Sequence, residues 1–177
     1  MDWSAEARAA RVEAIVFDVD GVLTRGDLVY GADGEWKIFD VQDGHGFVLA
    51  RQAGLKIGLI SGRSGEALRR RAQDLKVDAL REGVTRKGAA FLELCRQWRV
   101  QPHAVCFVGD DLIDLPALRE AGFPVAVPNA VREVLDRVAW VTPRRGGEGA
   151  ARDTIEFILK AKGKWPAIVH AYAEGEG

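Results

Sequence analysis

The sequence is poor in the residues and runs that mark several classes of protein. Its 177 residues include only two cysteines and three histidines. Cys95 and Cys106 give neither a disulfide framework nor the ligand spacing of a zinc or iron site. We expect both to be small buried residues in a reducing cytoplasm. No apolar run approaches the length of a membrane span, and the first residues lack the regions of a secretory signal.

An excess of charge of either sign is also missing. Lysine and arginine number 25 against 26 aspartate and glutamate, a formal net charge of −1. This balance leaves no electrostatic footprint for nucleic acid or an anionic membrane, so we expect neither as a partner. With 47% hydrophobic residues, the chain is long enough for one domain with a sizeable core.

The most informative stretch is residues 15–24, where an apolar run ends in two carboxylates. Its β-branched residues predict a strand buried on both faces, as at the centre of a parallel sheet. Asp18 and Asp20 then lie at the carboxyl end of that strand, where open α/β sheets place their active sites. Gly21 allows a sharp turn there. An ordinary solvated Asp-Gly turn is the alternative, so the rest of the chain must decide.

Further apolar runs alternate with helical patterns along the chain. Residues 56–60, 77–80, 104–108, 124–127 and 139–142 predict strands, and a helix is expected from Asp43 to a stop at Gly54. This alternation predicts an α/β fold, a three-layer Rossmann-like domain with a mostly parallel sheet and no separate cap domain. We expect a lead-in over residues 1–12, the domain over 13–162 and a flexible tail over 163–177.

A β-hairpin is predicted within residues 26–40. Two short apolar runs flank glycine, alanine and aspartate, which is a hairpin signal. It leaves directly from the Asp18–Asp20 turn, so we expect it to project beside the site as a flap. Trp36 and Phe39 are either packing residues or an oligomer contact.

Polar residues end three of the predicted strands, and parallel strands bring such ends to one edge. The residues expected there are Asp18, Asp20, Ser61, Asp110, Asp111 and Asp114. Clustered carboxylates need a hard cation, and Mg²⁺ accepts two or three protein oxygens while keeping several waters.

These residues resemble the four motifs of haloacid-dehalogenase-type phosphohydrolases. The motifs are residues 18–24, Ser61, Lys87 and residues 109–114, and the resemblance spans residues 13–162. Within that superfamily the chain resembles the small capless group that includes 3-deoxy-D-manno-octulosonate 8-phosphate phosphatases. The resemblance therefore implies a cytoplasmic phosphoric monoester hydrolase of lipopolysaccharide biosynthesis.

The resemblance implies a role for each motif residue. Asp18 would be the nucleophile that forms an aspartyl-phosphate, and Asp20 would be the general acid and then the general base. Mg²⁺ would be held by the Asp18 carboxylate, the Asp20 backbone carbonyl and Asp110. Supporting roles fall to Asp111 and Asp114.

Two further motif residues would contact the phosphoryl group. Ser61 would donate a hydrogen bond to a phosphoryl oxygen, and Lys87 would offset the charge of Asp18 and of the transferred group. Spacing alone would make Lys87 an exposed helix lysine.

The substrate implied by the resemblance is an acidic sugar phosphate. Arg63 and Arg71 match positions that bind substrate in the octulosonate phosphatases, as do Asp43 and Gly44. Val48 departs from the pattern, because a basic residue is common there. A nonulosonate 9-phosphate is the alternative substrate, although the group that acts on it usually has glutamate where Arg63 stands.

The resemblance also implies a homotetramer, in which hairpin flaps meet and close a site that has no cap. Two other classes stay open. One is a non-catalytic sugar-phosphate binder, which would have no need of both Asp18 and Asp20. The other is a two-component receiver domain, which the Asp-x-Asp spacing disfavours. The role of His45, beside Asp43 and Gly44, stays open.

Overall fold

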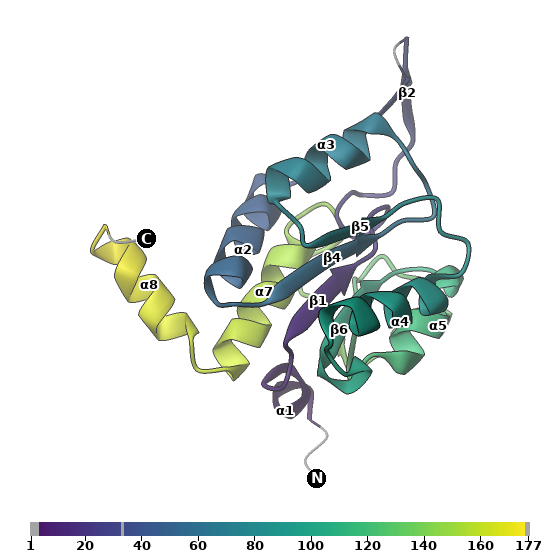
Figure 1. Ribbon diagram of the computed structural model, residues 1–177. Helices are drawn as coiled ribbons and strands as arrows, with labels where there is room; N and C mark the ends of the chain where they lie inside the picture. Colours follow the sequence, from purple (N-terminus) through teal and green to yellow (C-terminus); the bar gives the residue numbers. More distant parts are fainter. Residues whose placement is uncertain (1–3, 33, 176–177) are drawn as a thin grey trace.

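The computed structural model describes residues 4–32 and 34–175, and its centre is a six-stranded parallel sheet (Figure 1). The strand order is β5-β4-β1-β6-β7-β8. The strands are β1 (Ala14–Phe17), β4 (Lys56–Ile60), β5 (Ala79–Arg81), β6 (Val105–Gly109), β7 (Phe123–Ala126) and β8 (Trp140–Val141). Every residue of β1 and β6 is buried, as expected for central strands of a parallel sheet with both faces covered.

Helices cover the two faces of this sheet. On one side α2 (Val41–Gln52) packs against α7 (Ala150–Ala161), with α3 (Glu66–Leu75) beside α2 and α1 (Ala5–Ala9) beside α7 (Figure 1). On the other side α4 (Lys87–Trp98) packs against α5 (Leu115–Glu120); the one-turn helix α6 (Arg132–Leu135) precedes β8. The predicted three-layer α/β fold is confirmed. Cys95 and Cys106 are buried and free, also as predicted.

The order of the strands places a crevice at the end of β1. The chain runs from β1 outward to β4 and β5, then crosses back to β6, β7 and β8 on the other side. Phe17 on β1 lies beside Leu59 on β4 and Val108 on β6. Because these three strands are parallel and in register, the residues that follow them emerge side by side at one edge.

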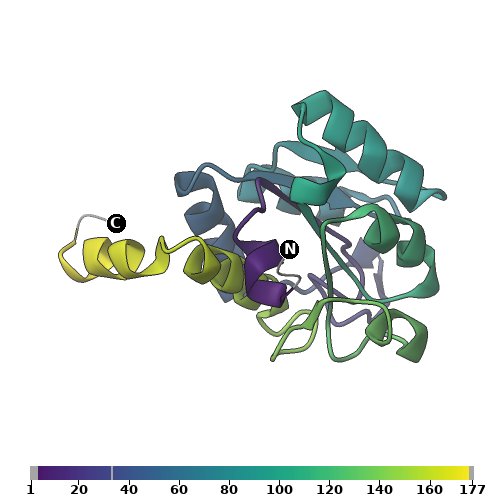
Figure 2. The ribbon, with the colours of Figure 1, turned by 90° about the horizontal axis from the view of Figure 1, so that it is seen from below.

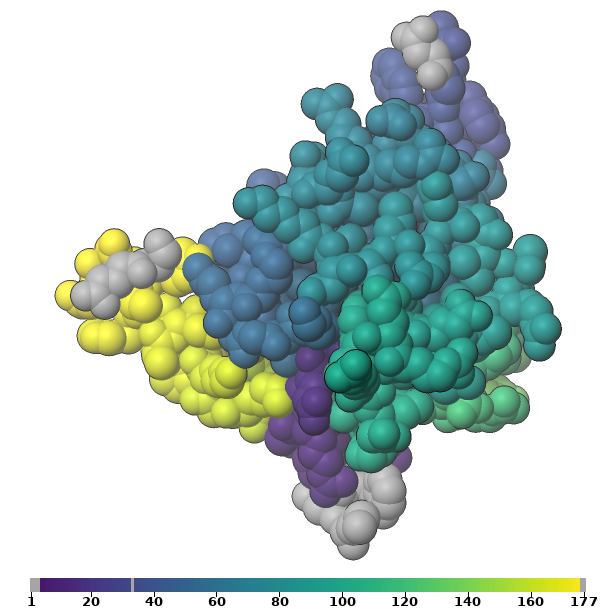
Figure 3. Space-filling model, viewed as in Figure 1, coloured from purple at the N-terminus to yellow at the C-terminus, as the bar shows by residue number. Residues whose placement is uncertain are grey.

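The hairpin projects from this edge, as Figures 1 and 3 show. Strands β2 (Val29–Gly31) and β3 (Gly34–Trp36) pair antiparallel, with Val29 opposite Trp36. Several of its large apolar side chains face solvent: Tyr30 is 71% exposed and Trp36 61% exposed. In the described part of the chain this hairpin is the only insertion over the site, so there is no separate cap domain.

Two boundaries differ from the sequence predictions. Helix α2 begins at Val41 rather than Asp43, because the Asp40 side chain accepts hydrogen bonds from the backbone N–H groups of Gln42 and Asp43. The segment after Gly163, expected to be a flexible tail, contains a helix, α8 (Trp165–Ala173).

Helix α8 extends away from the domain beyond α7 (Figure 2). Pro166 in its first turn suits a helix start, and Trp165 lies against Arg152 and Lys160 of α7. The glycines at the two ends of this segment made it resemble a loop. None of the described helices is long and apolar enough to cross a membrane.

Candidate active site

Three carboxylates meet at the carboxyl ends of β1 and β6. Oxygens of Asp18, Asp110 and Asp114 lie within 4.8 Å of one another. Asp18 follows β1 directly and is 4% exposed, while Asp114 is fully buried in the short 3₁₀ turn after β6. The sequence prediction that these strand ends converge is therefore correct.

Lys87 is the cation that this cluster contains. Its Nζ lies 2.7 Å from Asp18 Oδ1 and 2.7 Å from Asp114 Oδ1, and the side chain is 1% exposed. Burial by itself would lower the pKa of Lys87, but the charges of Asp18 and Asp114 outweigh it and raise that pKa. Lys87 is therefore a buried ammonium in contact with Asp18, and the interpretation as an exposed helix lysine is wrong.

Asp114 organises the loop between β6 and α5. Its Oδ2 accepts the backbone N–H groups of Asp110 at 2.9 Å and Asp111 at 3.1 Å, and its Oδ1 accepts from Lys87. Asp111 is exposed and caps the following turn through the N–H of Leu112. Both oxygens of Asp114 are thus engaged by protein donors, which suits the supporting role expected for it.

The residues present fit a hard divalent cation. Burial, followed by the charge of Asp114, raises the pKa of Asp18, and burial followed by Asp18 raises that of Asp110. The two carboxylates therefore repel strongly when ionised, and carboxylate oxygens are the ligands that Mg²⁺ prefers. A Cβ on Gly21 would lie 2.0 Å from Asp110 Oδ2, so only glycine leaves room for that carboxylate.

Asp20 belongs to a different set of charges, on the hairpin side of the crevice. Its Oδ1 accepts a hydrogen bond from Lys37 Nζ. Lys37 also contacts Glu35 at 2.7 Å, and Glu35 in turn accepts from Arg63. Arg63 was predicted to bind substrate; here its guanidinium pairs with a hairpin glutamate.

The remaining predicted residues are Ser61, Arg71 and Gly44. Ser61 follows β4, is fully buried, and its Oγ accepts the N–H of Arg63 at 3.0 Å. Arg71 donates to the carbonyl of Asp40 at 3.0 Å and lies over the ring of Phe39. Gly44 lies beside it, since a Cβ there would approach Arg71 Nη2 to 3.1 Å.

Comparisons with known proteins agree with this geometry. A family model described as "Hydrolase: haloacid dehalogenase-like hydrolase" matches residues 46–122. The 3-deoxy-D-manno-octulosonate 8-phosphate phosphatase KdsC of Escherichia coli K12 is 36% identical over 159 residues, covering 89% of this chain and 85% of the relative. The chain belongs to the haloacid dehalogenase-like hydrolases.

Two solved structures resemble this hydrolase closely. The octulosonate 8-phosphate phosphatase of Moraxella catarrhalis, in complex with magnesium, phosphate and KDO, has a TM-score of 0.92 at 34% identity and covers 95% of this chain and 97% of its own. The cobalt-bound phosphatase of Haemophilus influenzae has a TM-score of 0.86 at 37% identity, covering 89% and 92%.

The turn after Asp20 is held by Asn129, a residue that the sequence analysis did not identify. Asn129 donates to the carbonyl of Gly21 at 2.8 Å and accepts the N–H of Gly146 at 2.8 Å. A Cβ on Gly146 would lie 1.7 Å from that carbonyl, so the loop that contains Gly146 packs directly on the turn after Asp20. Nothing in the local pattern around Asn129 pointed to this contact.

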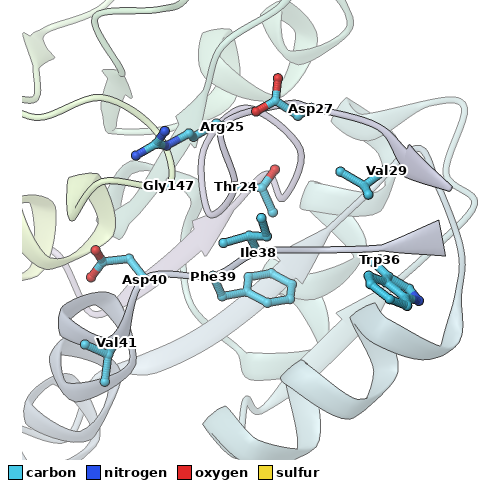
Figure 4. Close-up of a pocket in the computed structure, with 10 residues that line it drawn as sticks. All are labelled: Thr24, Arg25, Asp27, Val29, Trp36, Ile38, Phe39, Asp40, Val41 and Gly147. Carbon is cyan, nitrogen blue, oxygen red and sulfur yellow. The ribbon is translucent and has the colours of Figure 1, made fainter. Parts of the chain in front are cut away.

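The side of the hairpin that carries Trp36 and Ile38 borders a separate cavity of about 480 Å³ (Figure 4). Trp36, Ile38 and Phe39 line it from the hairpin side, and Arg25 and Gly147 from the other. The cavity does not include Asp18 or Lys87, so it is distinct from the crevice that holds the acids.

Asp43 in this hydrolase is directed at α7. It is 2% exposed, and its Oδ1 accepts the N–H of Arg152 at 2.8 Å; its Oδ2 has no hydrogen-bond partner among the described residues. Its role as a substrate ligand therefore stays a prediction, while its contact with α7 is structural. His45, two residues on, lies edge-on against Tyr172 of α8.

This burial predicts a pH-dependent stability. Burial first, and then the nearby Asp40, raise the pKa of Asp43 from 3.8 to about 6, although the N–H of Arg152 opposes the shift. An acid whose pKa is raised in the fold loses stabilisation as pH rises from about 4 to about 6, up to about 3 kcal/mol here.

Asp43→Asn keeps an oxygen for the N–H of Arg152 and removes the buried charge. We expect urea denaturation to show the variant more stable than wild type at pH 7.5, and the difference to vanish near pH 4. A variant less stable at both pH values would contradict this account.

Proposed function

We propose that this hydrolase is a Mg²⁺-dependent phosphatase that releases phosphate from 3-deoxy-D-manno-octulosonate 8-phosphate. The observation that carries the proposal is the contact between Lys87 and Asp18 inside a cluster of three carboxylates, with Asp20 two residues away. The names of its relatives support the substrate, since the E. coli KdsC and the M. catarrhalis structure are octulosonate 8-phosphate phosphatases.

In the first step Asp18 attacks the phosphorus atom. A bond forms between a carboxylate oxygen of Asp18 and phosphorus as the bond from phosphorus to the sugar oxygen breaks. Asp20 gives its proton to the departing sugar oxygen. Lys87 keeps Asp18 oriented and offsets the negative charge, and Ser61 donates to a phosphoryl oxygen.

In the second step a water hydrolyses the aspartyl-phosphate. Asp20 accepts a proton from this water, whose oxygen bonds to phosphorus, and the bond to Asp18 breaks to free phosphate and the enzyme. The Asp18 and Asp110 carboxylates and the Asp20 carbonyl would hold Mg²⁺. The ion supplies charge neutralisation for the transferred phosphoryl group.

Arginines near the crevice suit the acid group of the sugar. Arg71 reaches the start of α2 beside Gly44. Arg63 lies after β4, and its guanidinium donates a hydrogen bond to Glu35 in this structure. A planar guanidinium binds a carboxylate with two parallel hydrogen bonds. We therefore assign recognition of the sugar carboxylate to these arginines, with Asp43 and Gly44 as neighbours.

A phosphate-release screen tests the substrate. The panel contains 3-deoxy-D-manno-octulosonate 8-phosphate, nonulosonate 9-phosphates and neutral sugar phosphates, each with and without Mg²⁺. We expect the octulosonate ester to give the highest kcat/KM. A nonulosonate ester with the highest kcat/KM would instead assign the alternative substrate. We would attribute that change to Val48, which stands where a basic residue is common.

We further propose that the hairpins of four copies meet in a homotetramer. The support is the exposed apolar surface of the hairpin and its stem, where Tyr30, Trp36 and Ile38 are 61–77% exposed. A site without a cap also needs a neighbour to exclude water. Light scattering at micromolar concentration should give four times the chain mass of 19.3 kDa, and a monomer would refute the assembly.

A cytoplasmic location is proposed as well. Its support is that Cys95 and Cys106 are both buried and unpaired, which suits a reducing compartment.

A further inference from the structure

The side chain of Lys37 is covered, although the residues on either side of it are exposed. Its side chain is 4% exposed, although it follows β3 on the projecting hairpin. Trp36 and Ile38, on either side of it, are 61% and 77% exposed. Because side chains alternate along an extended chain, Glu35 and Lys37 face the crevice while Trp36 and Ile38 face away.

The contacts of Lys37 form a chain of alternating charges. Nζ donates to Asp20 Oδ1 and pairs with Glu35 Oε1 at 2.7 Å, and Glu35 Oε2 accepts from Arg63. Burial alone would lower the pKa of Lys37, but its hydrogen bonds with Asp20 and Glu35 outweigh burial and raise it. Lys37 therefore stays an ammonium, held from both sides.

We propose that Lys37 is a positioning residue that fixes the Asp20 carboxyl group for proton transfer to the departing sugar oxygen. The inference rests on the proposed phosphatase function. With Oδ1 held by Lys37, the proton travels on Oδ2 of Asp20 to the ester oxygen as its bond to phosphorus breaks and the bond from Asp18 forms. Asp20 regains a proton from the attacking water, and Lys37 keeps its own throughout.

The contact with Glu35 fixes the position of the Lys37 ammonium group beside Asp20. A lysine side chain has four rotatable bonds and loses much rotamer freedom when it is fixed. Glu35 and Arg63 hold the ammonium before the substrate arrives, so this cost does not fall on the transition state. Asp20, by contrast, is on a turn and 22% of its side chain is exposed.

Leaving-group dependence provides the test. Phenyl phosphate and p-nitrophenyl phosphate are alike around phosphorus, but phenolate needs a proton to leave and nitrophenolate does not. In Lys37→Met we expect kcat/KM to fall about 100-fold for phenyl phosphate and less than about threefold for p-nitrophenyl phosphate. Lys37→Arg, which keeps the charge, should recover phenyl phosphate activity to within about tenfold of wild type.

Two further variants make the test independent of folding. Lys56→Met removes a more exposed lysine at the start of β4, which pairs with Asp78 at 2.8 Å, and should change the activity on neither ester. Glu35→Gln keeps Lys37 and weakens its ion pair with residue 35. We expect this variant also to lose more kcat/KM on phenyl phosphate than on p-nitrophenyl phosphate, with a smaller difference than in Lys37→Met. It serves as the readout if Lys37→Met does not fold.

An equal loss on both esters, or no loss on either, would overturn the role of Lys37. Wild-type protein that releases phosphate from neither ester, nor from any sugar phosphate, would instead overturn the proposed function.

Discussion

Asp18→Asn is expected to lower phosphate release by at least about 10⁴-fold, because an amide oxygen cannot form the aspartyl-phosphate. Asp18 is the carboxylate in contact with Lys87, and in the proposed mechanism its oxygen bonds to phosphorus. Phosphate release from p-nitrophenyl phosphate and from the sugar ester should fall together. A non-catalytic sugar-phosphate binder would instead show no activity to lose.

The same variant should not lose stability. Burial and the charge of Asp114 raise the pKa of Asp18 to about 7, so the charge that Asp18 carries at pH 8 costs the fold free energy. Asparagine removes that charge, and Lys87 keeps its contact with Asp114 at 2.7 Å. We therefore expect an unchanged or higher Tm without divalent cation, and a smaller rise in Tm when Mg²⁺ is added.

Asp136→Asn is the matched control for Asp18→Asn. Asp136 follows α6 and pairs with Arg132, and both side chains are exposed, at 52% and 82%. Such pairs contribute little, so activity and the effect of Mg²⁺ on Tm should equal those of wild type. Residual activity of Asp18→Asn above about 1% of wild type would contradict a nucleophilic role for Asp18.

The sequence predicted the cluster because its chemistry is local to strand ends. Asp18 and Asp110 each follow an apolar run long enough to be a central strand, and parallel pairing then brings them together. The role of Lys87 could be predicted only from the family resemblance, because its burial depends on the carboxylates across the crevice and not on the pattern of its own helix.

Residues that act across the hairpin could not be found in the same way. Glu35 and Lys37 alternate with the apolar Trp36 and Ile38, and their partners Arg63 and Asp20 are 28 and 17 residues away in the chain. Only the three-dimensional path of the hairpin brings these charges together.

The prediction for the C-terminal segment was wrong for another reason. Glycine at both of its ends suggested a loop, whereas Trp165 and Tyr172 pack on α7 and α2 and stabilise α8. These contacts lie outside the segment, so its own sequence did not reveal them.

Lys87→Met is expected to cost both stability and activity. It leaves the carboxylates of Asp18, Asp110 and Asp114 within 4.8 Å of one another without the buried ammonium. Removing one partner of a buried ion pair costs about 3–5 kcal/mol, which corresponds to a fall in Tm of about 10 °C for a chain of this size. The rate kcat should fall about 10³-fold, since the charge opposite the phosphoryl group is lost.

A second substitution separates these two effects. In Lys87→Met with Asp114→Asn, one carboxylate is gone, and the asparagine oxygen can still accept the N–H groups of Asp110 and Asp111. We expect thermal unfolding to show that this double variant recovers much of the lost Tm, because the buried charge is again smaller. Activity should not recover, since the ammonium beside Asp18 is still missing. A double variant that regained kcat would show that Lys87 acts only through Asp114, and a single variant with wild-type Tm would show that the carboxylates need no cation from the protein.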